Sequence, residues 1–176
     1  RNYRVMKYRY LQNWKNERVL SSLNTKTRLS IIDNNPLTDR LTSRINHNFR
    51  VQVLEQSSIN NKLLSESINI RCTGIGIYRN VVLTTHHYPD IEAHTFILEK
   101  YISGKERFLK ILGQRSLGTY ILKPTRFKKK ETIYKIKNDL IHRITEYKNG
   151  KKKIYVNEVF PNTFCLRNIS YLGARC

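Results

Sequence analysis

The chain has 176 residues and carries 33 Lys and Arg residues against 13 Asp and Glu residues, which gives a formal net charge of +20 at pH 7. A hydrophobic content of 39% with 11 Tyr and 6 Phe excludes global disorder, and the length fits one domain able to enclose a small ligand site. No apolar run approaches the roughly 18 residues that a membrane-spanning helix needs, so we expect a soluble protein. The positive charge leaves an anionic partner open, nucleic acid included.

The beginning of the chain differs in composition from the rest. Residues 1–25 are basic and rich in Tyr, without a clear hydrophobic period. We interpret them as a basic N-terminal extension with room for one helix, and residues 26–176 as the folded domain. Within that domain, Asn35 followed by Pro36 is typical of a helix start, because Asn caps helices and Pro suits the first helical position. A short helix is expected over residues 35–45.

Two stretches in the first half of the domain predict strands. Residues 49–54 alternate between polar and apolar side chains, which is the period of a half-buried strand. After a polar link, residues 67–78 and 81–88 form two further runs with high β-propensity. We interpret Arg79-Asn80, which separates these two runs, as the turn of a hairpin.

The middle of the chain predicts another helix. Ser103 can cap its start and Gly113 can end it. The apolar positions between them fit one buried stripe of a short helix, made of Phe108, Leu109, Ile111 and Leu112.

The last third of the chain contains its strongest turn signal. Residues 132–147 are a long mixed segment, and the Asn149-Gly150 pair that follows is typical of a type I′ hairpin turn. Residues 154–160, IYVNEVF, then form the return strand. Hairpins in succession with helices between them predict a single-domain α+β fold with a mainly antiparallel sheet.

This return strand holds an acid among apolar residues. Strand periodicity places Glu158 on the same face as Ile154, Val156 and Phe160. If that face is the core, burial of the carboxylate costs several kcal/mol unless a cation or a hydrogen-bond donor meets it. Arg71 is a second charge inside an apolar run. Taken alone, each of the two is read more simply as a member of a structural ion pair than as a catalytic group.

Several other candidate sites lack the pattern that their chemistry needs. The adjacent residues His86 and His87 point to opposite faces of a strand, and with His94 they do not reach metal-ligand spacing. Gly74 and Gly76 lack the third glycine of a dinucleotide loop and indicate a bulge or a close approach of two backbones.

The lysine runs and the remaining motifs also favour simple interpretations. Residues 128–130 and 151–153 are Lys triplets, and we interpret both as solvated charges beside turns. The sequence contains no glycine-rich phosphate loop, no G-x-S-x-G elbow and no Cys/His nucleophile arrangement. Any chemistry is therefore expected to run without a metal or a cofactor.

Three pieces of the sequence resemble the chorismate pyruvate-lyase family. Residues 104–120, GKERFLKILGQRSLGTY, resemble the family's G-x-E…LG-x-x-x-LG-x-Y segment. Residues 37–40, LTDR, are similar to its (M/L)-T-x-R helix start, and residues 156–161, VNEVFP, to its terminal x-x-E-x-F strand. The order and spacing agree over residues 31–166, and the plastid-encoded member of red algae is the one that the chain most resembles.

This resemblance implies a fold, a reaction and a set of site residues. The family has a single domain with an antiparallel sheet, helices packed against it and a buried site under helical flaps. Its members split chorismate into 4-hydroxybenzoate and pyruvate. By the resemblance, Arg71 and Glu158 would be catalytic and would hold the ring carboxylate and the ring hydroxyl. Backbone groups near Leu37 and Leu117 would complete the substrate-binding site.

The resemblance also implies a biological setting. The partner would be the small-molecule substrate chorismate, with nucleic acid not expected, and the protein would be a monomer without a cofactor. It would lie in the chloroplast stroma and supply the aromatic head group of a quinone of the plastoquinone or ubiquinone type. Two alternatives remain open: a basic organellar nucleic-acid-binding module, and an aromatic-acid binder without turnover.

Overall fold

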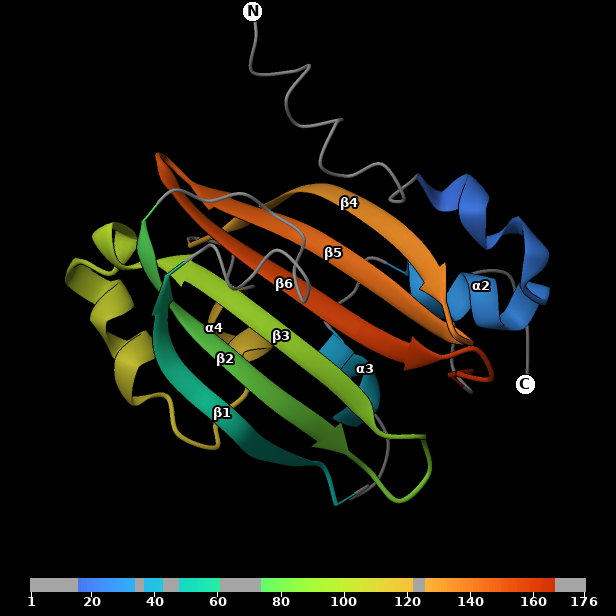
Figure 1. The fold of residues 1–176 in the computed structure, drawn as a ribbon. Helices are drawn as coiled ribbons and strands as arrows, with labels where there is room; N and C mark the ends of the chain where they lie inside the picture. The colour runs from blue at the N-terminus through green and yellow to red at the C-terminus, as the bar shows by residue number, and fades with distance from the viewer. Residues whose placement is uncertain (1–15, 34–36, 43–47, 61–73, 122–125, 167–176) are drawn as a thin grey trace, which may run out of the picture.

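The structure, a computed structural model, describes residues 16–33, 37–42, 48–60, 74–121 and 126–166. These residues form a six-stranded antiparallel sheet with the strand order β1-β2-β3-β6-β5-β4 (Figure 1). The strands are β1 (Arg50–Asn60), β2 (Ile75–Thr84), β3 (Ile91–Leu98), β4 (Lys128–Lys137), β5 (Leu140–Asn149) and β6 (Lys152–Pro161). The expected single-domain fold with a mainly antiparallel sheet and packed helices is confirmed.

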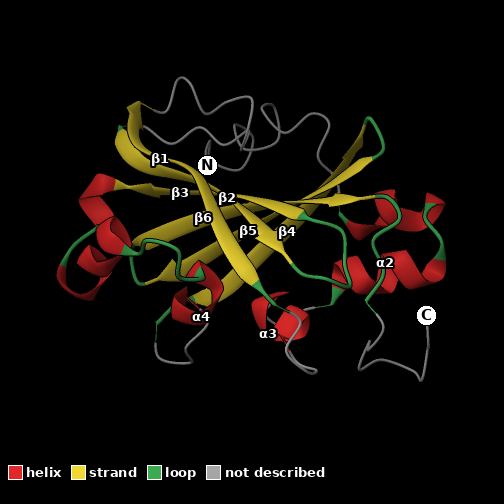
Figure 2. Cartoon of the chain, turned by 90° about the horizontal axis from the view of Figure 1, so that it is seen from below, coloured by secondary structure: helices red, strands yellow, loops and turns green. Residues whose placement is uncertain are grey.

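Short helices cover one face of this sheet. They are η1 (Glu17–Ser22), α2 (Thr25–Ile32), α3 (Leu37–Thr42), η3 (Glu99–Tyr101), η4 (Gly104–Ile111) and α4 (Leu117–Ile121). Figure 2 shows α2, α3 and α4 on the same side of the strands. Among the described residues, no helix is long and apolar enough to cross a membrane.

The N-terminal helices begin where local side chains cap them. Asn24 accepts a hydrogen bond from the Thr27 N–H at 2.8 Å, which satisfies a backbone donor that the first turn of α2 leaves unpaired. Leu20 of η1 has no exposed surface. Of the helix expected over residues 35–45, the structure describes α3. The division of the chain at residue 25 stays a prediction, because residues 1–15 lie outside the described residues.

The expected hairpin turn at Arg79-Asn80 is wrong. Strand β2 runs through both residues, and Arg79 pairs with Gln56 of β1 and with Thr95 of β3. The chain turns only after Thr84 and returns as β3. Arg and Asn between apolar runs indicated a turn in the sequence, but in the sheet they are opposite-facing residues of one continuous strand.

Two tight turns connect the last three strands, and the second confirms the hairpin expected before residues 154–160. Asn138 and Asp139 link β4 to β5 with φ angles of 53° and 61°, as a type I′ turn requires. Gly150 and Lys151 link β5 to β6, and Gly150 has a φ of 57°. Positive φ at the first central residue alone is the type II′ pattern, so the type I′ turn expected at Asn149-Gly150 is wrong, although the hairpin itself is present.

The helix expected over residues 103–113 is a 3₁₀ helix, η4, and its buried stripe differs from the expected one. Leu109 and Leu112 are buried, whereas the side chain of Ile111 is 76% exposed. A 3₁₀ helix has three residues per turn, so positions 109 and 112 share a face and position 111 turns away from it.

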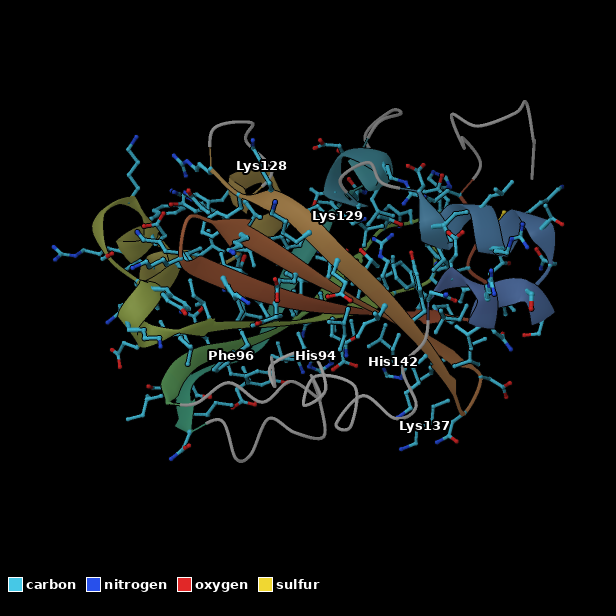
Figure 3. The ribbon with its side chains drawn as sticks, turned by 90° about the horizontal axis from the view of Figure 1, so that it is seen from above. His94, Phe96, Lys128, Lys129, Lys137 and His142 are labelled. Atoms are coloured by element: carbon cyan, nitrogen blue, oxygen red, sulfur yellow. The ribbon has the colours of Figure 1, made fainter. Side chains whose placement is uncertain are left out.

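Apolar side chains pack on both faces of the sheet. On the helix face, one cluster gathers around Leu20, Ile31 and Phe160, and another around Leu109, Ile121 and Ile154. On the opposite face, Phe96 packs with Tyr78, Leu98 and Ile144. Figure 3 labels His94, Phe96 and His142 on that side. The central strand β3 is therefore largely buried on both faces, and the space between the two helix-face clusters is where a site can form.

The close backbone approach expected in the Gly74 to Gly76 stretch is confirmed at Gly76. A Cβ there would lie 2.4 Å from the Phe96 ring and 2.6 Å from the Ile97 carbonyl oxygen. We therefore expect Gly76→Ala to lower the free energy of unfolding by about 1–3 kcal/mol, the usual cost of overpacking.

Urea denaturation followed by circular dichroism measures this change. Ser58→Ala, on the exposed part of β1, is the control and should stay within about 0.5 kcal/mol of the wild type. Equal stability of Gly76→Ala and the wild type would contradict the close approach.

Candidate functional site

A pocket lies between the sheet and the two short helices α3 and α4. Its cavity volume of about 60 Å³ is several times the ~10–15 Å³ that one water molecule needs. Three of the residues expected from the sequence line it, namely Leu37, Leu117 and Glu158. The other lining residues are Asp33, Thr38, Val51, Arg79, Val81, Leu83, Ala93, Thr95, Ser116, Gly118, Ile121, Lys129, Arg143, Tyr147 and Val156.

The two helices that cover the pocket contact each other directly. Thr38 of α3 and Ser116, just before α4, share a hydrogen bond of 2.6 Å between their hydroxyl groups. A Cβ at Gly118 would lie 3.0 Å from the Thr38 hydroxyl, so glycine permits this close approach. Leu37 and Leu117 are the first residues of α3 and α4. The role of their backbone groups in binding stays a prediction.

Glu158 projects from β6 into this pocket and meets a cation there. Its Oε2 accepts a hydrogen bond from Nε of Arg143 at 2.7 Å and forms an ion pair with Nη2 of the same guanidinium, also at 2.7 Å. The Glu158 side chain is 11% exposed and that of Arg143 is 5% exposed. The partner is the residue directly opposite Glu158 on β5. Among the described residues none donates to Oε1 of Glu158, which leaves that oxygen for a ligand.

Arg143 also ties the end of α2 to the sheet. Its Nη1 donates to the carbonyl oxygens of Ile31 at 2.6 Å and Asp33 at 3.3 Å. Burial lowers the pKa of Arg143, but the charge of Glu158 and its hydrogen bond outweigh this and raise the pKa above its ordinary value. Arg143 is therefore a fixed cation that positions both Glu158 and the chain entering α3.

A second ion pair stands behind the pocket wall. Arg40 of α3 lies with its Nε 3.2 Å from Oδ2 of Asp33, and its Nη2 donates to the Ser30 carbonyl oxygen at 2.6 Å. Burial and the charge of Arg143 lower the pKa of Arg40 to about 10. Asp33 thus faces a cation from the helix that follows it, as Glu158 faces one from the neighbouring strand.

Arg79 is the cation at the other end of the pocket. It is 5% exposed, its Nη1 donates to Oε1 of Gln56 at 2.7 Å, and its Nη2 donates to the Gly113 carbonyl oxygen at 2.6 Å. Among the described residues it has only neutral hydrogen-bond partners, and burial lowers its pKa. A buried guanidinium facing a cavity without a carboxylate suits an anionic ligand group.

The arginine expected in the site, Arg71, lies outside the described residues, and its role stays a prediction. Arg79 was missed because we interpreted it as part of a turn. The signal that pointed to Glu158 was present for Arg79 as well: Ile77, Val81 and Leu83 share its strand face. A search for charged residues on the apolar face of a predicted strand would therefore have identified both residues.

Lys129 corrects the interpretation of residues 128–130 as solvated charges. Lys128 and Lys130 are exposed, but Lys129 is half-buried and lines the pocket. Burial and the charge of Arg143 lower its pKa to about 8, while Glu158 acts in the opposite direction. Tyr147 lies opposite Lys129 on β5, and burial followed by the charge of Glu158 raises its pKa.

The charges around the pocket are not balanced. Within the part of the chain that the structure describes, four cations lie in or beside the pocket with the two carboxylates of Asp33 and Glu158, namely Arg40, Arg79, Lys129 and Arg143. The excess of two positive charges lies in a partly desolvated space, where electrostatic interactions are stronger than in water. A small dianion is the kind of ligand that this site favours.

Histidines and acids elsewhere do not add a metal centre. Among the described residues, no group of three or more His, Cys, Asp and Glu side chains is arranged to hold a metal ion. His94 instead lies on the opposite face of the sheet, where its Nδ1 is 2.6 Å from the Tyr78 hydroxyl and its Nε2 is 3.2 Å from Glu92.

Comparison with known proteins gives one match that covers most of the chain. The family model described as chorismate lyase matches residues 11–166. No curated protein matches the chain significantly.

Two solved structures are also similar to the chain. A transcriptional regulator of the GntR family from Bacillus cereus has 15% identity and a TM-score of 0.45, covering 69% of this chain and 97% of its own. The "possible transcriptional regulator YydK" from Bacillus subtilis has 13% identity and a TM-score of 0.40, covering 65% and 58%. We draw no argument from likenesses of this degree.

The pair of Arg143 and Glu158 can be tested by a double-mutant cycle. Removing one member leaves the other charge buried, so Glu158→Leu and Arg143→Met should each lower the free energy of unfolding by about 3–5 kcal/mol. The double variant should lose clearly less than the sum, by about 1–3 kcal/mol, because neither charge is then stranded.

Urea denaturation of the four proteins measures the coupling. The exposed pair of Lys110 and Glu99, 3.1 Å apart, is the control, and its cycle should give less than about 1 kcal/mol. Additive effects in the buried cycle would mean that the two side chains stabilise the fold independently.

Proposed function

The chain belongs to the chorismate lyase family, and we propose that it is an active lyase that converts chorismate into 4-hydroxybenzoate and pyruvate. In this reaction the bond between ring carbon 3 and the ether oxygen breaks and the proton on carbon 4 leaves. The electrons of that C–H bond complete the aromatic ring. The released enolpyruvate takes up one proton at its methylene carbon and becomes pyruvate, so that atoms and charge balance.

The observation that carries this proposal is the pair of buried charges on opposite walls of one pocket. Arg79 on β2 and Glu158 on β6 stand two strands apart in the sheet, at a strand spacing of ~4.8 Å. A six-membered ring with a carboxylate at one end and a hydroxyl at the other can bridge a gap of roughly 10 Å of this kind. The excess of two positive charges matches the two carboxylates of chorismate.

Each side chain has a distinct role in this proposal. Arg79 clamps the ring carboxylate with charge-assisted hydrogen bonds. Oε1 of Glu158 accepts a hydrogen bond from the ring hydroxyl, and Arg143 holds the carboxylate in place through Oε2. Val156, on the same face as Glu158, packs against the ring, and Leu37 and Leu117 close the pocket from the helix side.

Catalysis in this scheme consists of orientation and exclusion of water. Aromatisation supplies the driving force, so the site needs to hold the conformer from which the enolpyruvyl ether leaves. Helices α3 and α4, joined by the contact between Thr38 and Ser116, shield the ring from solvent. We propose that no metal takes part.

The finer biological role rests on the resemblance to the plastid-encoded member of red algae. We propose that the product supplies a quinone head group in the chloroplast stroma, and that residues 1–25 are an extension outside the catalytic domain. The contrasting role of a nucleic-acid-binding module is supported by the net charge of +20 and not by the arrangement of charges in the pocket.

Incubation of the purified chain with chorismate should yield 4-hydroxybenzoate and pyruvate in equal amounts. Chromatography of the reaction mixture measures both products. Glu158→Gln replaces the charged group that accepts a hydrogen bond from the ring hydroxyl. We therefore expect kcat/KM to fall by about 10–100-fold, which corresponds to the free-energy contribution of a hydrogen bond to a charged group. The exposed Glu55→Gln on β1 is the matched control and should keep wild-type activity.

Two results would count against the lyase. Binding of 4-hydroxybenzoate without turnover by the folded wild type would indicate an aromatic-acid binder instead. Salt-sensitive binding of RNA that survives Glu158→Gln would favour the nucleic-acid alternative.

The choice between Arg79 and Arg71 is tested separately. We expect Arg79→Met to weaken chorismate and 4-hydroxybenzoate binding alike by about 100-fold, because both ligands carry the ring carboxylate. Arg71→Met should leave both affinities near the wild-type values. Calorimetric titration gives the affinities, and circular dichroism checks that each variant is folded. If Arg71→Met alone loses binding, Arg71 and not Arg79 binds the ring carboxylate.

A further inference from the structure

The Lys129 side chain lines the pocket, but neither the carboxylate nor the hydroxyl of 4-hydroxybenzoate contacts it in the proposed binding mode. It comes from β4, the edge strand of the sheet, and it points to the helix face, whereas Lys128 and Lys130 beside it are exposed. Figure 3 labels Lys129 near the start of β4 and on the side where α3 lies. The pocket therefore has a third charged wall besides those of Arg79 and Glu158.

The sheet topology places these three charges in a definite order. Arg79 lies on β2, Glu158 on β6 and Lys129 on β4, and two strand steps separate each from the next. With a strand spacing of ~4.8 Å, the strands that carry Arg79 and Lys129 each lie roughly 10 Å from β6 across the sheet. Along the strands, Arg79 is level with Val156 and Lys129 is level with Ile154. Across the strands Glu158 therefore lies between the two cations, and along β6 both cations lie toward the Ile154 side of it.

Chorismate carries its charges in a matching order. One carboxylate is attached to ring carbon 1, and the hydroxyl lies opposite it on carbon 4. The enolpyruvyl ether, with the second carboxylate, is attached to carbon 3 beside the hydroxyl. If Arg79 holds the first carboxylate and Glu158 the hydroxyl, the enolpyruvyl group can extend from the side of the ring toward β4 and Lys129.

We infer that Lys129 forms a subsite for the enolpyruvyl carboxylate of chorismate, and so for the carboxylate of the pyruvate that leaves. This inference rests on the proposed function. It assigns Arg79 and Lys129, which both line the pocket, to the two carboxylates of one ligand. It also predicts a discrimination, since 4-hydroxybenzoate lacks the second carboxylate and leaves this subsite unused.

The electrostatic surroundings of Lys129 suit this role. It is surrounded by Glu158 of β6, by Arg143 and Tyr147 of β5, and by the pair of Asp33 and Arg40 at the helix side. Burial and the nearby cations lower its pKa to about 8, so the amine is mostly charged at neutral pH. A ligand carboxylate beside it would raise the pKa again, which means that binding and protonation support each other.

The decisive experiment compares two ligands in one variant. In Lys129→Met we expect KM for chorismate to rise by about 10–100-fold, the usual loss of a charge-assisted contact, while the affinity for 4-hydroxybenzoate changes by less than about threefold. Lys129→Arg should recover most of the loss. Lys130→Met, exposed on the same strand, should leave both constants unchanged.

A pH profile gives an independent readout. The charged form of Lys129 exists below its pKa, so kcat/KM of the wild type should fall as the pH rises through about 8. In Lys129→Arg this fall should move to higher pH, because arginine stays charged there. In Lys129→Met, the fall near pH 8 should be absent. Tyr147, with its raised pKa, does not titrate in this range.

The outcomes separate this inference from the proposed function. If Lys129→Met weakens the binding of chorismate and of 4-hydroxybenzoate equally, or changes neither affinity, the proposed subsite is wrong. If the wild type forms no product, the lyase fails, and calorimetric binding of the two ligands to wild type and Lys129→Met tests the subsite without turnover. Absence of chorismate binding to the wild type would overturn both.

Discussion

The buried ion pair between Arg143 and Glu158 is the interaction on which the rest of this site depends. The two residues lie opposite each other on β5 and β6 in the sheet interior. Without each other, both would be charges removed from water at a cost of several kcal/mol. Nη1 of Arg143 donates hydrogen bonds to the carbonyl oxygens of Ile31 and Asp33. These bonds hold the segment that precedes α3 next to the pocket.

The pocket follows from this arrangement of charges and short helices. The pocket is lined by the ion pair of Arg143 and Glu158 and by residues of the short helices α3 and α4. The remaining space collects cations whose pKa values are lowered by burial, among them Arg79 and Lys129. A dianionic ligand would place negative charge beside these desolvated cations and stabilise their charged forms, which connects the charges of the pocket to its chemistry.

Elements with a strong local signal could be predicted, and those that depend on distant partners could not. The hairpin before β6 and the face of Glu158 followed from a glycine turn and from the two-residue period of a strand. The turn assigned to Arg79-Asn80 was wrong because polar residues inside a strand and polar residues in a turn look alike until the neighbouring strands are known. The stripe of residues 108–112 differed because a 3₁₀ helix replaced an α-helix there.

The sequence by itself determined the class of fold, the family resemblance and the one acid that a strand would bury, because these depend on local period and on motif order. Only the tertiary structure decided what Glu158 meets. Its partner Arg143 is set by strand register, Arg79 by the pairing of β2, and the position of Lys129 by the place of β4 at the sheet edge. Register and strand order arise from contacts between residues far apart in the chain, and a single sequence does not display those contacts.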